Sequence, residues 1–161
     1  MRKVLSGFYR LLQFLITLLM GLLIIPVSLQ VLSRYTGIIP RYIWTEEVAR
    51  FCFMWIIMIG AMIAVKDGSH FDVDVLPLPY KPRVQAASRI VVNLFMLIVA
   101  VAFVGYGYHF SKFGYIQHSE LTGINMLSIN IAWPLAGLAW IAFLGEKFFD
   151  DILILIRGKK P

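Results

Sequence analysis

The stretch LLQFLITLLMGLLIIPVSLQVLS, residues 11–33, contains no charged side chain and decides the class of this protein. Three further stretches without Lys, Arg, Asp or Glu follow it, at Phe51–Val65, Ile90–Ser111 and Leu121–Gly145. An α-helix rises about 1.5 Å per residue, so about 20 apolar residues cross a bilayer core that is about 30 Å thick. The sequence therefore predicts an all-α integral membrane protein with four transmembrane helices.

The composition agrees with this class. The chain has 161 residues, of which 60% are hydrophobic, and its mean hydropathy is +0.79. Its 15 basic and 9 acidic residues all lie outside the four apolar stretches. The net charge of +6 could indicate nucleic-acid binding, but the basic residues form no patch or stripe and lie beside helix ends. We predict contacts with lipid headgroups, no nucleic-acid partner, and a single four-helix membrane domain over residues 1–161.

The expected helices cover about residues 6–33, 45–65, 89–111 and 128–147. The second apolar stretch is the unusual one, because its 15 residues span only about 22 Å. This helix must recruit residues upstream of the stretch. Its start then draws Arg50, and with it Glu46 and Glu47, toward the outer edge of the hydrocarbon, where charged groups are costly unless they are paired.

The distribution of basic residues predicts the orientation of the helices. If the N-terminus is cytoplasmic, the inner segments carry 11 basic residues and the outer segments carry four, namely Arg34, Arg41, Arg50 and Lys112. The positive-inside rule then places both termini in the cytoplasm. The first apolar run, of 23 residues, exceeds the roughly 7–15 of a signal-peptide core, so we expect an uncleaved first helix.

The densest polar cluster is Trp44-Thr45-Glu46-Glu47-Val48-Ala49-Arg50, and two interpretations of it stay open. In the first, the cluster only starts a helix: Thr45 is the N-cap, the acidic pair favours the helix dipole, and Glu46 and Arg50 are i,i+4 partners. In the second, this charged set at the membrane edge docks against another protein. Trp44 fits either interpretation as an interfacial anchor.

Small residues at a spacing of four mark helix faces that can approach another helix closely. Gly60 and Ala64 form such a pair in the second helix, and Ala132 and Ala136 form one in the fourth. Such faces serve internal packing or docking to a partner helix, and the sequence leaves both possibilities open.

The sequence gives little support for a metal site or a haem site. Three potential metal ligands alternate in His70-Phe71-Asp72-Val73-Asp74, but they are isolated from any second cluster, and we expect a cytoplasmic loop without a metal. Haem would need facing histidines at matched depth, which His109 and His118 do not indicate. We expect no cofactor and no enzyme activity.

Two roles to consider for a protein of this class are a stand-alone small transporter or channel and a membrane anchor of an enzyme complex. A self-sufficient secondary transporter needs polar groups near the bilayer midplane. The expected helix centres offer only Ser28, Gln30 and Asn93, and no carboxylate. This argues against independent transport.

Several elements of the sequence resemble the small membrane subunit of tripartite ATP-independent periplasmic (TRAP) transporters. The resemblance covers Arg34 to Asp74 in order and spacing, and the rest of the chain by length and helix count. The elements are Arg34-Tyr35, the Trp44–Arg50 cluster, Gly60-Ala61, and His70-Phe71 with Asp74 nearby.

The resemblance implies a small scaffold subunit in the bacterial inner membrane, part of a sodium-coupled symport system that takes up organic acid anions of the C4-dicarboxylate or sialic acid type. The implied partners are a large elevator-type membrane subunit, which carries the substrate and sodium sites, and a periplasmic substrate-binding protein. We expect an interface with the large subunit, and a binding-protein contact at Arg34, Arg41 and Lys112. The expected interface residues are Trp44, Glu46, Glu47, Arg50, Gly60 and Ala64.

Overall fold

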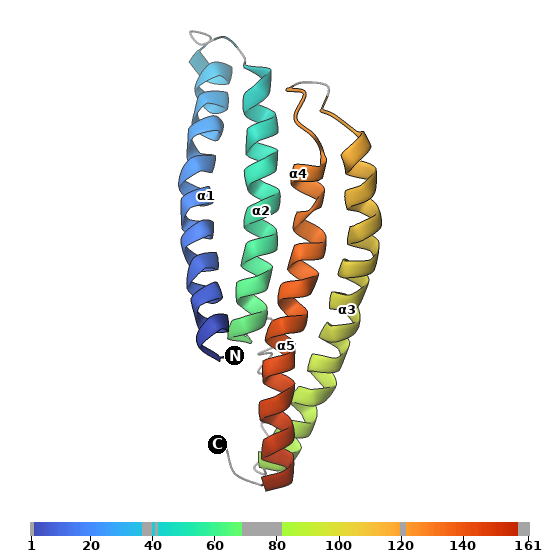
Figure 1. Ribbon diagram of the computed structural model, residues 1–161. Helices are drawn as coiled ribbons and strands as arrows, with labels where there is room; N and C mark the ends of the chain where they lie inside the picture. Colours follow the sequence, from blue (N-terminus) through green and yellow to red (C-terminus); the bar gives the residue numbers. More distant parts are fainter. Residues whose placement is uncertain (1, 37–39, 41, 69–81, 120–121, 158–161) are drawn as a thin grey trace.

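A computed structural model describes residues 2–36, 40, 42–68, 82–119 and 122–157 of the chain (Figure 1). Four helical segments are long and apolar enough to cross a membrane, the last of them spanning α4 and α5 together. This confirms the predicted all-α membrane protein with four spans. The helices are α1 (Arg2–Thr36), α2 (Ile43–Asp67), α3 (Pro82–Ile116), α4 (Leu127–Asn130) and α5 (Ala132–Arg157).

Helix α2 recruits upstream residues as expected, and it starts two residues earlier than predicted. With 25 residues it is about 37 Å long, enough to cross the hydrocarbon core. Tyr42, in an extended conformation, is the N-cap, and it makes no side-chain capping bond. The expected N-cap, Thr45, was therefore wrong. Thr45 lies within the first turn, where its backbone N–H and its hydroxyl both donate to the Tyr42 carbonyl, at 3.2 and 2.7 Å.

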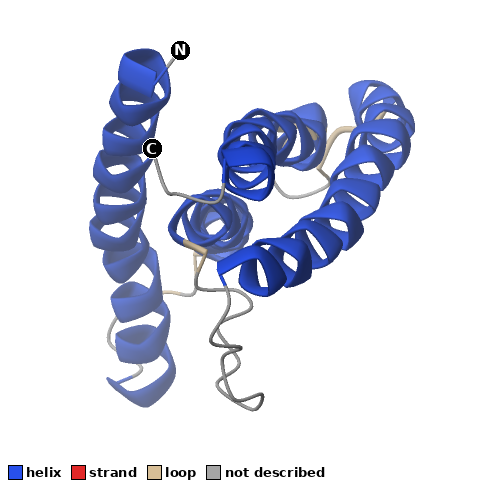
Figure 2. Ribbon diagram, turned by 90° about the horizontal axis from the view of Figure 1, so that it is seen from below, coloured by secondary structure: helices blue, strands red, loops and turns tan. Residues whose placement is uncertain are grey.

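The helices form an open row rather than a closed bundle (Figures 1 and 2). Helix α1 packs on α2, α2 packs on α5, and α5 packs on α3, so the spatial order differs from the chain order. Within the most apolar part of each described span, only 6% of the residues are buried in the first span, against 44% in the fourth. Helices α1 and α3 are consequently the edges of the row.

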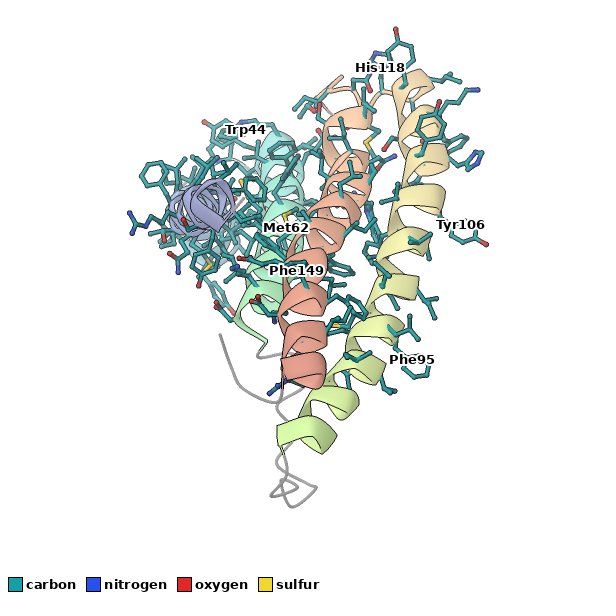
Figure 3. All side chains as sticks on the ribbon, turned by 60° about the horizontal axis from the view of Figure 1, so that its bottom comes forward. Trp44, Met62, Phe95, Tyr106, His118 and Phe149 are labelled. Atoms are coloured by element: carbon teal, nitrogen blue, oxygen red, sulfur yellow. The ribbon has the colours of Figure 1, made fainter. Side chains whose placement is uncertain are left out.

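The hydrophobic core lies where α2 meets α5, with α1 contributing Leu12. Met62 of α2 points into this core, whereas Phe95 and Tyr106 project from α3 away from the row (Figure 3). Such outward apolar side chains are expected where the solvent is lipid. The buried core residues are Leu12, Met58, Ile59, Met62, Val65, Ala132, Ala136, Ala139, Phe143 and Leu144.

Glycines allow α3 and α5 to pack with their backbones nearly in contact. A Cβ added at Gly107 of α3 would lie 2.8 Å from the backbone nitrogen of Pro134, and one at Gly137 of α5 would lie 2.8 Å from the carbonyl oxygen of Ala100. Real Cβ atoms almost never approach other heavy atoms below 3.0 Å. These two positions therefore need glycine, and they hold α3 and α5 together as a closely packed pair.

The expected fourth helix is interrupted at Ile131, which separates α4 from α5. Pro134 has no N–H to offer the carbonyl of Asn130, four residues earlier. The hydroxyl of Ser111 on α3 donates to that carbonyl instead, at 3.2 Å. Neighbouring side chains thus satisfy the freed backbone group, as a break within a membrane span requires.

Candidate partner interface

The predicted interface begins at the N-terminal end of α2, where Glu46 and Arg50 form the expected i,i+4 ion pair. The Arg50 guanidinium lies 3.3 Å from the Glu46 carboxylate, and the two side chains are 60% and 66% exposed. An ion pair as exposed as this contributes about 0–1 kcal/mol to stability. The pair neutralises Arg50 and does little to hold the fold.

Glu47 occupies a different environment from its neighbour. One residue advances a helix by about 100°, so Glu47 points into the molecule and is only 7% exposed. Its carboxylate oxygen Oε2 is buried and receives no hydrogen bond from the described part of the chain. A buried carboxylate without a partner costs several kcal/mol, roughly, unless another group compensates it.

A cavity of about 460 Å³ lies between the start of α2 and the connection from α3 to α4. The connection is held by an isolated antiparallel bridge between His118 and Asn125, and Figure 3 shows His118 at the end of α3. Glu47 is thereby brought beside a segment about 70 residues away in sequence, which no local pattern predicts. The lining residues are Glu46, Glu47, Arg50, Gln117, His118, Ser119 and Met126.

A second cavity, of about 520 Å³, lies between the C-terminal end of α1 and the N-terminal end of α2. It includes the exposed Arg34, one of the residues predicted to contact a binding protein. Lys112 is exposed on α3, and Arg41 lies outside the described residues. The structure therefore does not bring the three predicted basic residues together as one described site.

One member of the small-residue pair predicted on α2, Gly60, faces another helix of the same chain. A Cβ added at Gly60 would lie 3.5 Å from Cδ1 of Ile16, so Gly60 packs toward α1. Ala64 is half-buried, and its carbonyl accepts the N–H of Gly68, whose φ of +78° ends the helix. Trp44 is 46% exposed beside Tyr42. The partner role of these residues stays a prediction.

Polar contacts that we did not predict join the helices at their opposite ends. Lys66 of α2 forms an ion pair with Glu146 of α5, and the Lys147 ammonium donates to the carbonyl of Val65 at 2.7 Å. The latter bond satisfies one of the last carbonyls of α2, a favourable place for a cation. An ion pair and a hydrogen bond therefore stabilise the contact between α2 and α5 in addition to apolar packing.

Two further contacts tie the edge helices to the centre. The Tyr9 hydroxyl of α1 donates to the Asp67 carboxylate of α2 at 2.8 Å. On the other side, the buried Asp151 of α5 accepts from Arg89 at 3.0 Å and from Asn93 at 3.3 Å, both on α3. The expected topology placed Arg89 and Asp67 near one membrane face but Asn93 at a helix centre, so it did not predict that Asn93 pairs with Asp151.

Four spans, polar groups gathered at the helix ends and a buried carboxylate beside a cavity define a multi-pass membrane protein whose polar features suit contacts with other chains. Residues 23–153 match the family described as tripartite ATP-independent periplasmic transporters, DctQ component, and the chain belongs to this family. The resemblance inferred from the sequence is thus confirmed.

Relatives agree with this assignment. A Haemophilus influenzae protein that carries the provisional name of TRAP transporter small permease protein is 25% identical, over 99% of this chain and 98% of its own. The sialic acid TRAP transporter small permease protein SiaQ of Vibrio cholerae is 27% identical, over 86% of this chain and 79% of its own. The isethionate TRAP transporter permease protein DctMQ of Oleidesulfovibrio alaskensis is 33% identical, over 54% of this chain and 14% of its own.

The chain is therefore a TRAP transporter small permease subunit and not an enzyme. As such it is a multi-pass protein of the inner membrane that works with a large permease subunit, and in DctMQ the matching region is a small part of a much longer permease protein.

Proposed function

We propose that this chain is the fixed scaffold of a sodium-coupled, binding-protein-dependent secondary transporter that imports organic acid anions of the C4-dicarboxylate or sialic acid type. It would pack beside the large elevator-type subunit, which would carry out the translocation. Two relatives bear the names of sialic acid and isethionate transporters, and both of these solutes are organic acid anions.

The cross-bracing of the helices is the observation that carries the scaffold role. Glycines bring the α3 and α5 backbones nearly into contact. Ion pairs and hydrogen bonds then join α1 to α2, α2 to α5 and α5 to α3. A unit braced at each interface suits a stationary support better than a moving element. The open row also leaves long apolar faces on α1 and α3, which suit lipid or a partner helix.

The proposed orientation has both termini in the cytoplasm, as the excess of basic residues in the inner segments indicates. The ion pairs Lys66–Glu146 and Arg89–Asp151 would then lie at the cytoplasmic ends of the helices. The two cavities would open near the periplasmic ends. Exposed Arg34 and Lys112, with Arg41, would face the periplasmic binding protein.

Reconstitution tests the proposal. The large subunit, a purified binding protein and candidate organic acids are assayed in proteoliposomes with and without this chain, and with inward sodium or potassium gradients. Uptake should require both membrane subunits and sodium. Uptake by this chain alone would identify a stand-alone transporter instead, and uptake by the large subunit alone at full rate would refute the scaffold role.

Charge changes test the binding-protein contact. Arg34→Glu and Lys112→Glu should each lower uptake several-fold, with the neutral changes Arg34→Gln and Lys112→Gln in between, because surface charges mainly steer association. The membrane subunits should still co-purify. Uptake that does not change with the charge at these positions would contradict the contact.

A further inference from the structure

The cavity between the start of α2 and the α3–α4 connection contains one negative charge that its own walls leave uncompensated. Among its lining residues, Glu46 and Arg50 neutralise each other in a contact of 3.3 Å. Glu47 is then the remaining carboxylate, and its Oε2 accepts no hydrogen bond from His118, which also lines the cavity. Glu47 is more than nine-tenths buried, and its Oε2 atom has no donor in the described chain.

Burial distinguishes Glu47 from an ordinary acidic residue at a helix start. An exposed carboxylate in the first turn, such as Glu46, is hydrated and needs no partner. Glu47 cannot be hydrated to the same degree, and burying an ionised carboxylate is costly unless a cation or donor meets it. The position near the membrane edge adds to this cost, because charged groups there are normally paired.

The site suits a basic side chain better than a metal ion. The described residues contain no group of three or more His, Cys, Asp or Glu side chains that could hold a metal. A cavity of about 460 Å³ is far larger than an ion. One positive charge in it would neutralise the Glu47 carboxylate. An ammonium or guanidinium on a side chain supplies that charge together with donors in a fixed direction.

We propose that Glu47 receives a Lys or Arg side chain of the large permease subunit in this cavity, forming a buried ion pair that fixes the register of the two subunits. The proposal rests on the proposed function, since it presumes that the two membrane subunits dock directly. Gln117 and Met126 on the opposite wall would enclose the aliphatic stem of the incoming side chain.

The first experiment compares Glu47→Gln with Glu46→Gln in the two-subunit complex. Both changes remove one charge, keep the shape of the side chain and lie in the same helical turn. Glu47→Gln should weaken association about 30-fold or more, because it leaves the partner cation buried without its counter-charge. Glu46→Gln should change association less than two-fold, since Glu46 is exposed. Association is measured by co-purification against a dilution series in mild detergent.

A second experiment measures the unfolding midpoint of this chain alone, where Glu47→Gln should have the opposite effect to the one expected in the complex. Without the partner, Glu47→Gln removes an uncompensated buried charge, so the unfolding midpoint should stay level or rise. In the complex, the midpoint should fall. A fall in both states would show that Glu47 serves the internal fold, and this result would overturn the proposal even if the complex forms normally.

The source of the cation is identified by crosslinking from the cavity wall. A photoreactive amino acid at Gln117, which is exposed beside the cavity, is activated in membranes that contain the whole transporter. The expected product contains a large-subunit peptide with a Lys or Arg, and exchanging the charges of that residue and Glu47 should restore association. Crosslinks to the binding protein or to lipid alone would overturn the assignment. Loss of all association between wild-type subunits would instead refute the proposed function.

Discussion

The contact between α3 and α5 at Gly107 gives the sharpest prediction about the fold. A methyl group added at Gly107 would lie 2.8 Å from the nitrogen and 2.9 Å from Cδ of Pro134. Both atoms belong to a rigid ring in the backbone of α5, so no side chain can turn away. The closer contact is about 0.6 Å short of the 3.4 Å at which ordinary contact begins, and the two helices would have to separate.

The size of the effect follows from two opposing terms. Overpacking of this kind costs about 1–3 kcal/mol. Replacing glycine by alanine within a helix contributes up to about 1 kcal/mol in the favourable direction. Gly105→Ala, two residues away on the same helix, has nothing within 4 Å of the added Cβ and provides the favourable term alone. Gly107→Ala should therefore be about 1–3 kcal/mol less stable than Gly105→Ala.

Equilibrium unfolding in mixed detergent micelles measures this difference, with helicity followed by circular dichroism. Both variants should insert and show the same helical content as the wild type, because neither change affects hydrophobicity unfavourably. Equal stabilities of the two variants would refute the close approach of α3 and α5. A less stable Gly105→Ala would mean that the face of α3 that contacts α5 has been assigned to the wrong side.

The remaining predictions concern bonds between helices, and the same unfolding assay measures them. Trp55→Phe removes the hydrogen bond of 3.0 Å from the indole to the carbonyl of Ser128, and it should lower the free energy of unfolding by about 0.5–1.5 kcal/mol. The control Trp44→Phe, at an exposed position, should lower it by less than about 0.5 kcal/mol. Equal costs would show that the indole bond is dispensable. Arg89→Met should destabilise the protein by about 1–2 kcal/mol, because it leaves the buried Asp151 carboxylate without its cation. Asp151→Asn should destabilise it less, because this change removes the buried charge itself. The reverse order would argue that Asp151 is not charged in the folded protein.

Sequence patterns located the charged cluster at the start of α2 but not the environments of its members. The short second apolar stretch correctly required α2 to start among the charged residues, and the spacing of Glu46 and Arg50 predicted their ion pair. Nothing in the sequence distinguished Glu47 from Glu46. Their difference arises because neighbouring helical residues point about 100° apart, and only the tertiary structure decides which direction is buried.

The small residues gave a similar result. The spacing of Gly60 and Ala64, and of Ala132 and Ala136, indicated faces that permit close approach. It did not point to Gly107, where an added Cβ would meet Pro134 of α5, or distinguish it from Gly105, where an added Cβ would meet nothing within 4 Å. The interruption at Ile131 had a visible signal in Pro134. The prediction of one continuous helix nevertheless missed it, because a proline breaks a helix or merely kinks it according to whether neighbours satisfy the freed carbonyl.

The sequence by itself determined that this is a four-span membrane protein of the TRAP small permease type. Transfer from water to hydrocarbon depends on the length and polarity of a continuous run, and both are properties of the chain before it folds. Only the tertiary structure decided the order of helices in the row, the contacts that brace them and the burial of Glu47. Lipid and protein interior are equally apolar, so hydrophobicity cannot indicate which face of a membrane helix meets which. Backbone approach and hydrogen bonds between helices decide that, and they exist only once the helices are side by side.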